Sequence, residues 1–108
     1  MTVLFICIQN RLRSPTAEQV FADWPGIETA SAGPGNEADN LVTPELLRWA
    51  QLIFVMEPVH RRRLATRFQP HLGAARVVCL DIPDDYAYMA PDLIALLRRK
   101  VVRFLPPR

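Results

Sequence analysis

A cysteine and an arginine stand six positions apart in the stretch CIQNRLRS. Cys7 ends an apolar run, and Arg13 comes directly before a serine and a proline. A loop that leaves a buried strand and enters a helix directs backbone N–H groups and the positive end of the helix dipole at one point, so it binds anions. The planar guanidinium of Arg13 matches two phosphate oxygens at once. We therefore predict a phosphate-binding loop made of Ile8, Gln9, Asn10, Arg11, Leu12, Arg13 and Ser14.

The same donors would stabilise a thiolate, which makes Cys7 a candidate nucleophile. Ser14 can donate a hydrogen bond to that thiolate, and Asn10 tolerates the left-handed backbone that helps a tight loop to form. The second cysteine, Cys79, lies inside the apolar run RVVCL and is interpreted as a small core residue.

Three carboxylates follow that run in LDIPDDY, at Asp81, Asp84 and Asp85. A carboxyl group near the nucleophile could act as a general acid. The alternative is an ordinary turn and capping cluster before Pro91.

Apolar runs at 2–8, 27–33, 51–56 and 76–80 predict four strands. Helix starts are predicted at Ser14, as a cap with Pro15 in the first turn, and at the prolines Pro44, Pro58 and Pro91. Strands that alternate with helices indicate a three-layer α/β fold with a parallel sheet of about four strands. Ligands bind such sheets beyond the carboxyl ends of the strands, where residues 7–13, 31–35 and 81–86 should meet.

The length and composition indicate one domain over residues 1–108. The formal net charge of only +2 does not by itself argue for nucleic acid or a membrane as the main partner, so any electrostatic function must be local. We expect neither nucleic acid nor a membrane as partner. The apolar start lacks a signal-peptide pattern, so we expect a cytoplasmic protein with reduced cysteines. No spacing of Cys or His residues suggests a zinc site.

The basic residues at 61–63 and 98–103 are interpreted as solvated helix faces, and His60 and His71 as surface residues.

The stretch CIQNRLRSPTAE fits a C-x5-R-S phosphate loop and resembles the low-molecular-weight protein tyrosine phosphatases. TASAG, WAQLIFVME and DIPDDY are similar to later segments of that family. The resemblance implies Cys7 as the nucleophile, Arg13 as the phosphate clamp, Ser14 as the thiolate stabiliser, Asn10 as the loop organiser and Asp84 as the general acid, with no metal or organic cofactor.

The chain also departs from this family. It is shorter between Gly33 and Trp49, where the family carries an additional helix and part of the substrate wall. Leu12 stands where many members have a second cysteine, and Arg11 adds a charge to the loop. Asp85 replaces the proline after the family's acid, so Asp81, Asp84 and Asp85 all stay candidates for that role.

Three functions follow from these patterns. The first is a cysteine-dependent phosphomonoesterase, similar to protein tyrosine phosphatases, which acts on a phosphorylated protein or a small aryl phosphate through a phosphocysteine. The second is a thiol-dependent arsenate reductase, for which Cys79 would have to be the resolving thiol. The third is a phosphocysteine carrier or phosphate-binding module, against which Arg13 and the acidic segment count.

Overall fold

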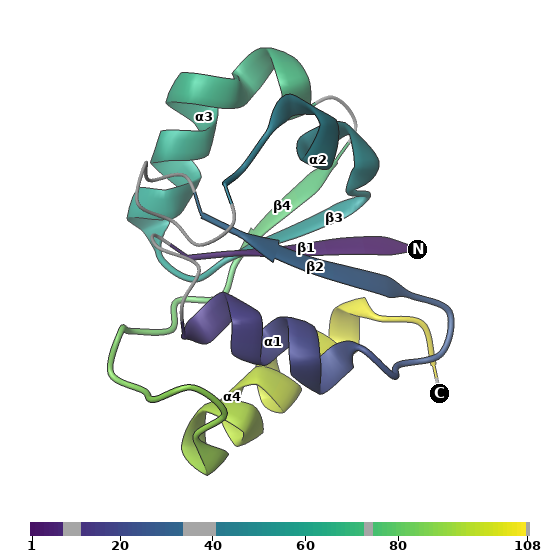
Figure 1. The fold of residues 1–108 in the computed structure, drawn as a ribbon, viewed down its shortest axis with the longest axis vertical. Coiled ribbons are helices and arrows are strands. Elements are labelled where there is room, and N and C mark those ends of the chain that lie inside the picture. The colour runs from purple at the N-terminus through teal and green to yellow at the C-terminus, as the bar shows by residue number, and fades with distance from the viewer. Residues whose placement is uncertain (8–11, 34–40, 73–74, 108) are drawn as a thin grey trace.

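Four parallel strands form one sheet in the order β2-β1-β3-β4 (Figure 1). The computed structural model describes residues 1–7, 12–33, 41–72 and 75–107, and of residues 69–72 it describes the backbone alone. The strands are β1 (Thr2–Ile6), β2 (Glu28–Ala32), β3 (Leu52–Val55) and β4 (Arg76–Cys79). Each strand thus lies inside a predicted apolar run.

The helices lie in two layers on opposite faces of the sheet. They are α1 (Arg13–Phe21), α2 (Pro44–Trp49), α3 (Pro58–Leu72) and α4 (Pro91–Val101), which is followed by the 3-10 turn η1 (Val102–Phe104). α2 and α3 cover one face, and α1 and α4 cover the other (Figure 1). The predicted three-layer α/β fold is confirmed. Within the described part of the chain, no helix is long and apolar enough to cross a membrane.

The central strand β1 is buried on both faces, and its alternation divides the core. Val3, Phe5 and Cys7 pack with the α1 and α4 side, whereas Leu4 and Ile6 pack with the α2 and α3 side. Side chains of a strand alternate between the two faces, so Cys7, the first residue after β1, continues the α1 side. The thiol is therefore directed toward the start of α1.

The start of α1 differs from the sequence prediction. Arg13 is the first helical residue, Leu12 occupies the cap position, and no side chain among the described residues caps the helix. The predicted cap by Ser14 is wrong, because the serine lies within the helix and its hydroxyl contacts the sulfur of Cys7 at 2.8 Å. Pro15 still lies in the first turn, where backbone N–H groups have no intrahelical partner.

The basic helix faces agree with the prediction except at one position. The arginines at 61–63, 98, 99 and 103 are exposed. Lys100 is half-buried, and its ammonium donates a hydrogen bond to the carbonyl of Leu80 at 2.7 Å. This lysine therefore belongs to a tertiary contact rather than to the solvated face.

Candidate active site

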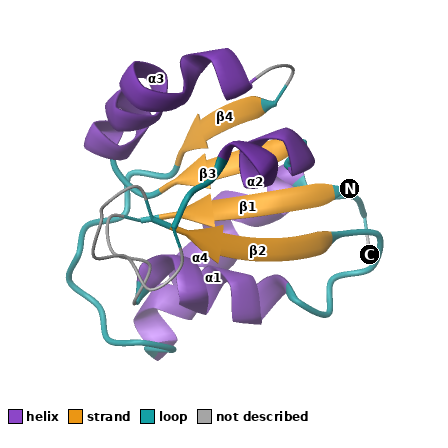
Figure 2. Cartoon of the chain, turned by 45° about the horizontal axis from the view of Figure 1, so that its top comes forward, coloured by secondary structure: helices purple, strands orange, loops and turns teal. Residues whose placement is uncertain are grey.

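The carboxyl ends of all four strands lie at one edge of the sheet (Figure 2). Cys7 follows β1 at this edge, and Glu57 comes two residues after the end of β3. The long connection from β4 to α4 begins there as well. This edge therefore gathers the described residues that the sequence marked for chemistry.

The sulfur of Cys7 is held at the first turn of α1. Its side chain is only 4% exposed. The Ser14 hydroxyl lies 2.8 Å from the sulfur, and the backbone N–H of Ser14 donates to it at 3.4 Å. The sulfur therefore lies at the N-terminal end of α1, in contact with a hydroxyl group and a backbone N–H.

Arg13 is buried at the same edge, with 2% of its side chain exposed. Its Nη1 donates to the carbonyl of Ile82 at 2.7 Å and lies 3.3 Å from Glu57 Oε1. Its Nε lies 3.7 Å from Asp84 Oδ1. The guanidinium therefore links α1 with the segments that follow β3 and β4, and its rigid fork can still present other donors to a ligand.

The three candidate acids occupy different places. Asp84 forms an ion pair with Arg13, and the side chain of Asp84 is 59% exposed. Asp81 is exposed and lines a neighbouring pocket. Asp85 is exposed one position further along. Among these candidates, the geometry favours Asp84 for a role next to Arg13.

Glu57 is a site residue that the sequence analysis missed. Its Oε1 lies 3.3 Å from Arg13 Nη1, and its Oε2 lies 3.5 Å from Nε2 of His60. The sequence pattern that could have identified it is an apolar strand followed by a carboxylate. Glu57 comes directly after the apolar run at 51–56, just as Cys7 comes at the end of the first apolar run. A carboxylate at this place holds the arginine in position.

His60 is fully buried, so the prediction of a surface residue is wrong. Its Nδ1 accepts a hydrogen bond from the backbone N–H of Glu57 at 3.2 Å, in the manner of a capping box at the start of α3. Burial and the nearby charge of Arg13 lower the pKa of His60 from 6.5 to about 4. The imidazole is therefore neutral at pH 7, where its Nε2 makes no hydrogen bond to any residue that the structure describes.

The connection after β4 is fastened at both ends. The N–H of Ile82 donates to the Met56 carbonyl at 2.7 Å, which continues the pairing beyond β4. Near the other end, the N–H of Met89 donates to the hydroxyl of the buried Thr16 on α1 at 2.9 Å. Asp84 lies between these two attachments. Hydrogen bonds on both sides therefore restrict the positions that its backbone can take.

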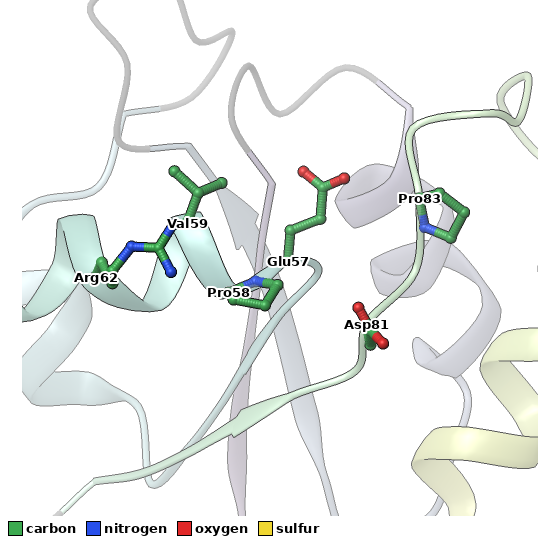
Figure 3. Close-up of a pocket in the computed structure, with 6 residues that line it drawn as sticks. All are labelled: Glu57, Pro58, Val59, Arg62, Asp81 and Pro83. Atoms are coloured by element: carbon green, nitrogen blue, oxygen red, sulfur yellow. The ribbon is translucent and has the colours of Figure 1, made fainter.

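A pocket of about 620 Å³ lies beside this arrangement (Figure 3). It is lined by Glu57, Pro58, Val59, Arg62, Asp81 and Pro83, which come from the start of α3 and the segment after β4. Glu57 contributes both to this pocket and to the ion pair with Arg13. The pocket therefore adjoins Arg13 through their shared neighbour Glu57.

Four residues of the predicted phosphate loop, Ile8, Gln9, Asn10 and Arg11, lie outside the described residues. The structure does place both ends of that loop, because Cys7 contacts Ser14 directly and Leu12 is partly exposed beside them. In the described ranges, no group of three or more His, Cys, Asp or Glu side chains is placed to hold a metal ion.

Known proteins resemble this chain in structure. No family model and no curated protein matches the chain. Among solved structures, the tyrosine phosphatase Wzb from Escherichia coli K30 matches with a TM-score of 0.76 at 23% identity, over 95% of this chain and 94% of that chain. The low-molecular-weight protein tyrosine phosphatase from Streptococcus pyogenes matches with a TM-score of 0.78 at 14% identity, over 97% and 93%. The chain has the low-molecular-weight protein tyrosine phosphatase fold.

A second group of similar structures in this phosphatase fold is named for another substrate. The YwlE arginine phosphatase from Geobacillus stearothermophilus matches with a TM-score of 0.75 at 22% identity, over 95% of this chain and 92% of that chain. The resemblance to low-molecular-weight phosphatases is thus confirmed for the fold. In this phosphatase fold, β1 lies between β2 and β3, so Cys7 follows the strand at which the sheet order switches.

Proposed function

We propose that the protein is a cysteine-dependent phosphomonoesterase of the protein tyrosine phosphatase type. The observation that carries this proposal is the contact of the buried Cys7 sulfur with the hydroxyl and N–H of Ser14, at the start of the helix that also presents Arg13. A thiolate at a helix N-terminus is suited to attack a phosphate, and an arginine of the same helical turn is suited to bind the phosphate oxygens. The predicted phosphate-binding residues, from Ile8 to Ser14, complete the proposed site.

The reaction proceeds in two steps. In the first, the Cys7 thiolate attacks phosphorus, an S–P bond forms, and the P–O bond to the leaving group breaks while Asp84 gives its proton to the leaving oxygen. In the second, water attacks phosphorus and gives a proton to Asp84, and the S–P bond breaks to release phosphate and restore the thiolate. Arg13 and the loop N–H groups stabilise the charge on the phosphoryl oxygens in both steps.

The contacts of Arg13 support this division of roles. Glu57 and the Ile82 carbonyl hold Nη1, so the arginine is oriented by protein groups before a substrate arrives. Asp84 lies 3.7 Å from Nε and is mostly exposed, which lets its carboxyl group reach the leaving group and exchange protons with water. A preorganised guanidinium stabilises the transition state without first having to reorganise.

We infer that the substrate is a phosphorylated protein or a small aryl phosphate. The similar structures include Wzb from Escherichia coli in complex with phosphate and the YwlE arginine phosphatase. Structures named for tyrosine and for arginine phosphatases match almost equally well. Phosphoarginine therefore belongs in the substrate panel beside phosphotyrosine. A reducing compartment such as the cytoplasm, where Cys7 stays a thiol, suits this activity.

The arsenate reductase alternative is disfavoured by the position of the second cysteine. Cys7 packs with the core cluster on the α1 and α4 face of the sheet, whereas Cys79 packs against the cluster on the opposite face. A resolving thiol must reach the sulfur that it attacks. A phosphocysteine carrier is disfavoured because Asp84 beside Arg13 would promote hydrolysis.

The proposed activity is tested by turnover of p-nitrophenyl phosphate, a phosphotyrosine peptide and phosphoarginine, with a chelator present and no added metal. Cys7→Ser should abolish turnover, while the matched variant Cys79→Ser should retain it. A parallel assay with arsenate and thiols should yield no arsenite. Turnover that survives in Cys7→Ser, or arsenite that forms at a comparable rate, would contradict the proposal.

The role of Asp84 is tested with leaving groups of different quality. A general acid contributes about 10²- to 10⁴-fold and matters most when the leaving group is poor. Asp84→Asn should therefore slow phenyl phosphate much more than p-nitrophenyl phosphate. Asp81→Asn and Asp85→Asn are the controls, and neither should show this difference. If Asp85→Asn shows it and Asp84→Asn does not, the acid is Asp85.

A further inference from the structure

The backbone bends sharply where β4 gives way to the connection that carries Asp84. Asp81 has φ of 56°, a left-handed conformation that, apart from glycine, asparagine and aspartate adopt most readily. The direction of the chain after Asp81 therefore depends on contacts that hold this bend in place.

Lys100 on α4 supplies such a contact. Its Nζ donates to the carbonyl of Leu80 at 2.7 Å and lies 3.3 Å from the carbonyl of Asp81. Successive carbonyls of an extended strand point in opposite directions, so a single ammonium cannot normally reach both. Here both face the same cation. The contact is therefore specific for the bent backbone.

Lys100 differs from its neighbours on the helix. Arg98 and Arg99 are exposed, whereas Lys100 is half-buried. Hydrogen bonds from a charged donor are stronger than neutral ones, and Lys100 places such a donor beneath the end of β4. This lysine thus connects α4 to the edge of the sheet where the site lies.

The bend at Asp81 sets the positions of Ile82 and Asp84 relative to Arg13. Directly after it, the Ile82 carbonyl accepts from Arg13 Nη1 at 2.7 Å. Two residues further, the Asp84 carboxylate lies 3.7 Å from Arg13 Nε. The far end of the connection is fixed separately, by Met89 on Thr16. A change at Asp81 would therefore be passed on to Asp84.

We propose that Lys100 is a positioning residue for the general acid. Its ammonium holds the bend at Asp81, and the bend brings Asp84 next to Arg13. This inference rests on the proposed phosphatase function, because it assigns a task to Lys100 within that same site. Among the described residues, the hydrogen bonds of Lys100 go to the carbonyls of Leu80 and Asp81 and not to Cys7, Arg13 or Asp84.

The test compares Lys100→Met with Arg99→Met, a matched removal of charge from the next exposed residue. Misplacement of a catalytic group by about 1 Å can cost about 10²-fold, and general acids matter most for poor leaving groups. In Lys100→Met, kcat/KM for phenyl phosphate should fall by about 10- to 100-fold, and that for p-nitrophenyl phosphate by less than about 3-fold. Arg99→Met should change neither. Lys100→Arg, which keeps a long cationic donor, should recover most of the loss.

A second measurement does not depend on activity. Amide hydrogen exchange at residues 80–84 should become faster in Lys100→Met than in Arg99→Met or in the wild-type chain. Lys100→Gln gives the same comparison if Lys100→Met does not fold. Equal slowing of both substrates, or exchange that is unchanged, would overturn the proposal. If the wild-type chain hydrolyses no phosphomonoester, the proposed function fails, and exchange alone then decides whether Lys100 holds the bend.

Discussion

The pH dependence of folding should show the titration of His60. In the folded chain its pKa is lowered from 6.5 to about 4, first by burial and then by the charge of Arg13, with a smaller contribution from Arg63. Glu57 and Asp84 oppose this effect. Below a pH of about 6.5 the unfolded chain binds a proton that the folded chain does not bind until about pH 4. The contribution of His60 is therefore complete above pH 6.5 and is lost as the pH falls toward 4.

The size of this effect follows from the two pKa values. One pKa unit corresponds to about 1.4 kcal/mol, so the full difference between 6.5 and about 4 amounts to roughly 3 kcal/mol. Between about pH 7 and about pH 5, the free energy of unfolding should fall by about 2 kcal/mol through His60 alone. A loss of that size is a large fraction of the stability of a small domain.

The assay is urea denaturation of the wild-type chain and of His60→Gln at both pH values. Glutamine is the usual residue at this helix position in a capping box, so it can keep the acceptor for the Glu57 N–H while removing the titration. The wild-type chain should lose about 2 kcal/mol more than the variant on acidification. The two chains differ only at residue 60, so the difference between their losses isolates the effect of His60. Equal losses would refute the buried, neutral state of His60.

Three further substitutions test individual contacts. Ser14→Ala removes the hydroxyl 2.8 Å from the Cys7 sulfur and should slow turnover of p-nitrophenyl phosphate by about 10- to 100-fold, since a hydrogen bond to a charged group contributes about 1.5–3 kcal/mol; unchanged turnover would contradict the assigned role. Arg13→Lys should lower kcat/KM for the same substrate by about 100-fold, because an ammonium lacks the bidentate fork, and a loss below about 3-fold would count against a phosphate clamp. Thr16→Val removes the acceptor of the Met89 N–H and the donor to the Leu12 carbonyl, and it should lower the free energy of unfolding by about 1–3 kcal/mol in urea, whereas no change would show that both contacts are dispensable.

The parts of the site that are close in sequence could be predicted. Cys7 and Ser14 are separated by one loop, so an apolar strand followed by an amphipathic helix determines that both ends of the loop meet. The helix starts could also be predicted from the sequence, because α2, α3 and α4 each begin at a proline. The cap at Ser14 was predicted wrongly because its hydroxyl has two possible partners, the helix backbone and the sulfur.

The parts of the site that depend on tertiary contacts could not be predicted in this way. Glu57 follows β3 and contacts Arg13, which follows the neighbouring strand β1 but is far from Glu57 in sequence. Lys100 on α4 reaches the carbonyls after β4 from another layer. A histidine pattern alone does not show that His60 is buried, because its partner is a backbone N–H rather than a side chain. Distinguishing Asp84 from its acidic neighbours likewise required the position of Arg13.

The central claim is that Cys7 carries the phosphoryl group during turnover. It is tested most directly by rapid mixing with p-nitrophenyl phosphate, acid quenching within the first turnover, and mass spectrometry of the peptide that contains Cys7. A burst of p-nitrophenolate close to one per chain, with one phosphoryl group on Cys7, is the predicted result. Turnover without a burst and without any phosphoryl group on Cys7, or with the group on another residue, would contradict the account.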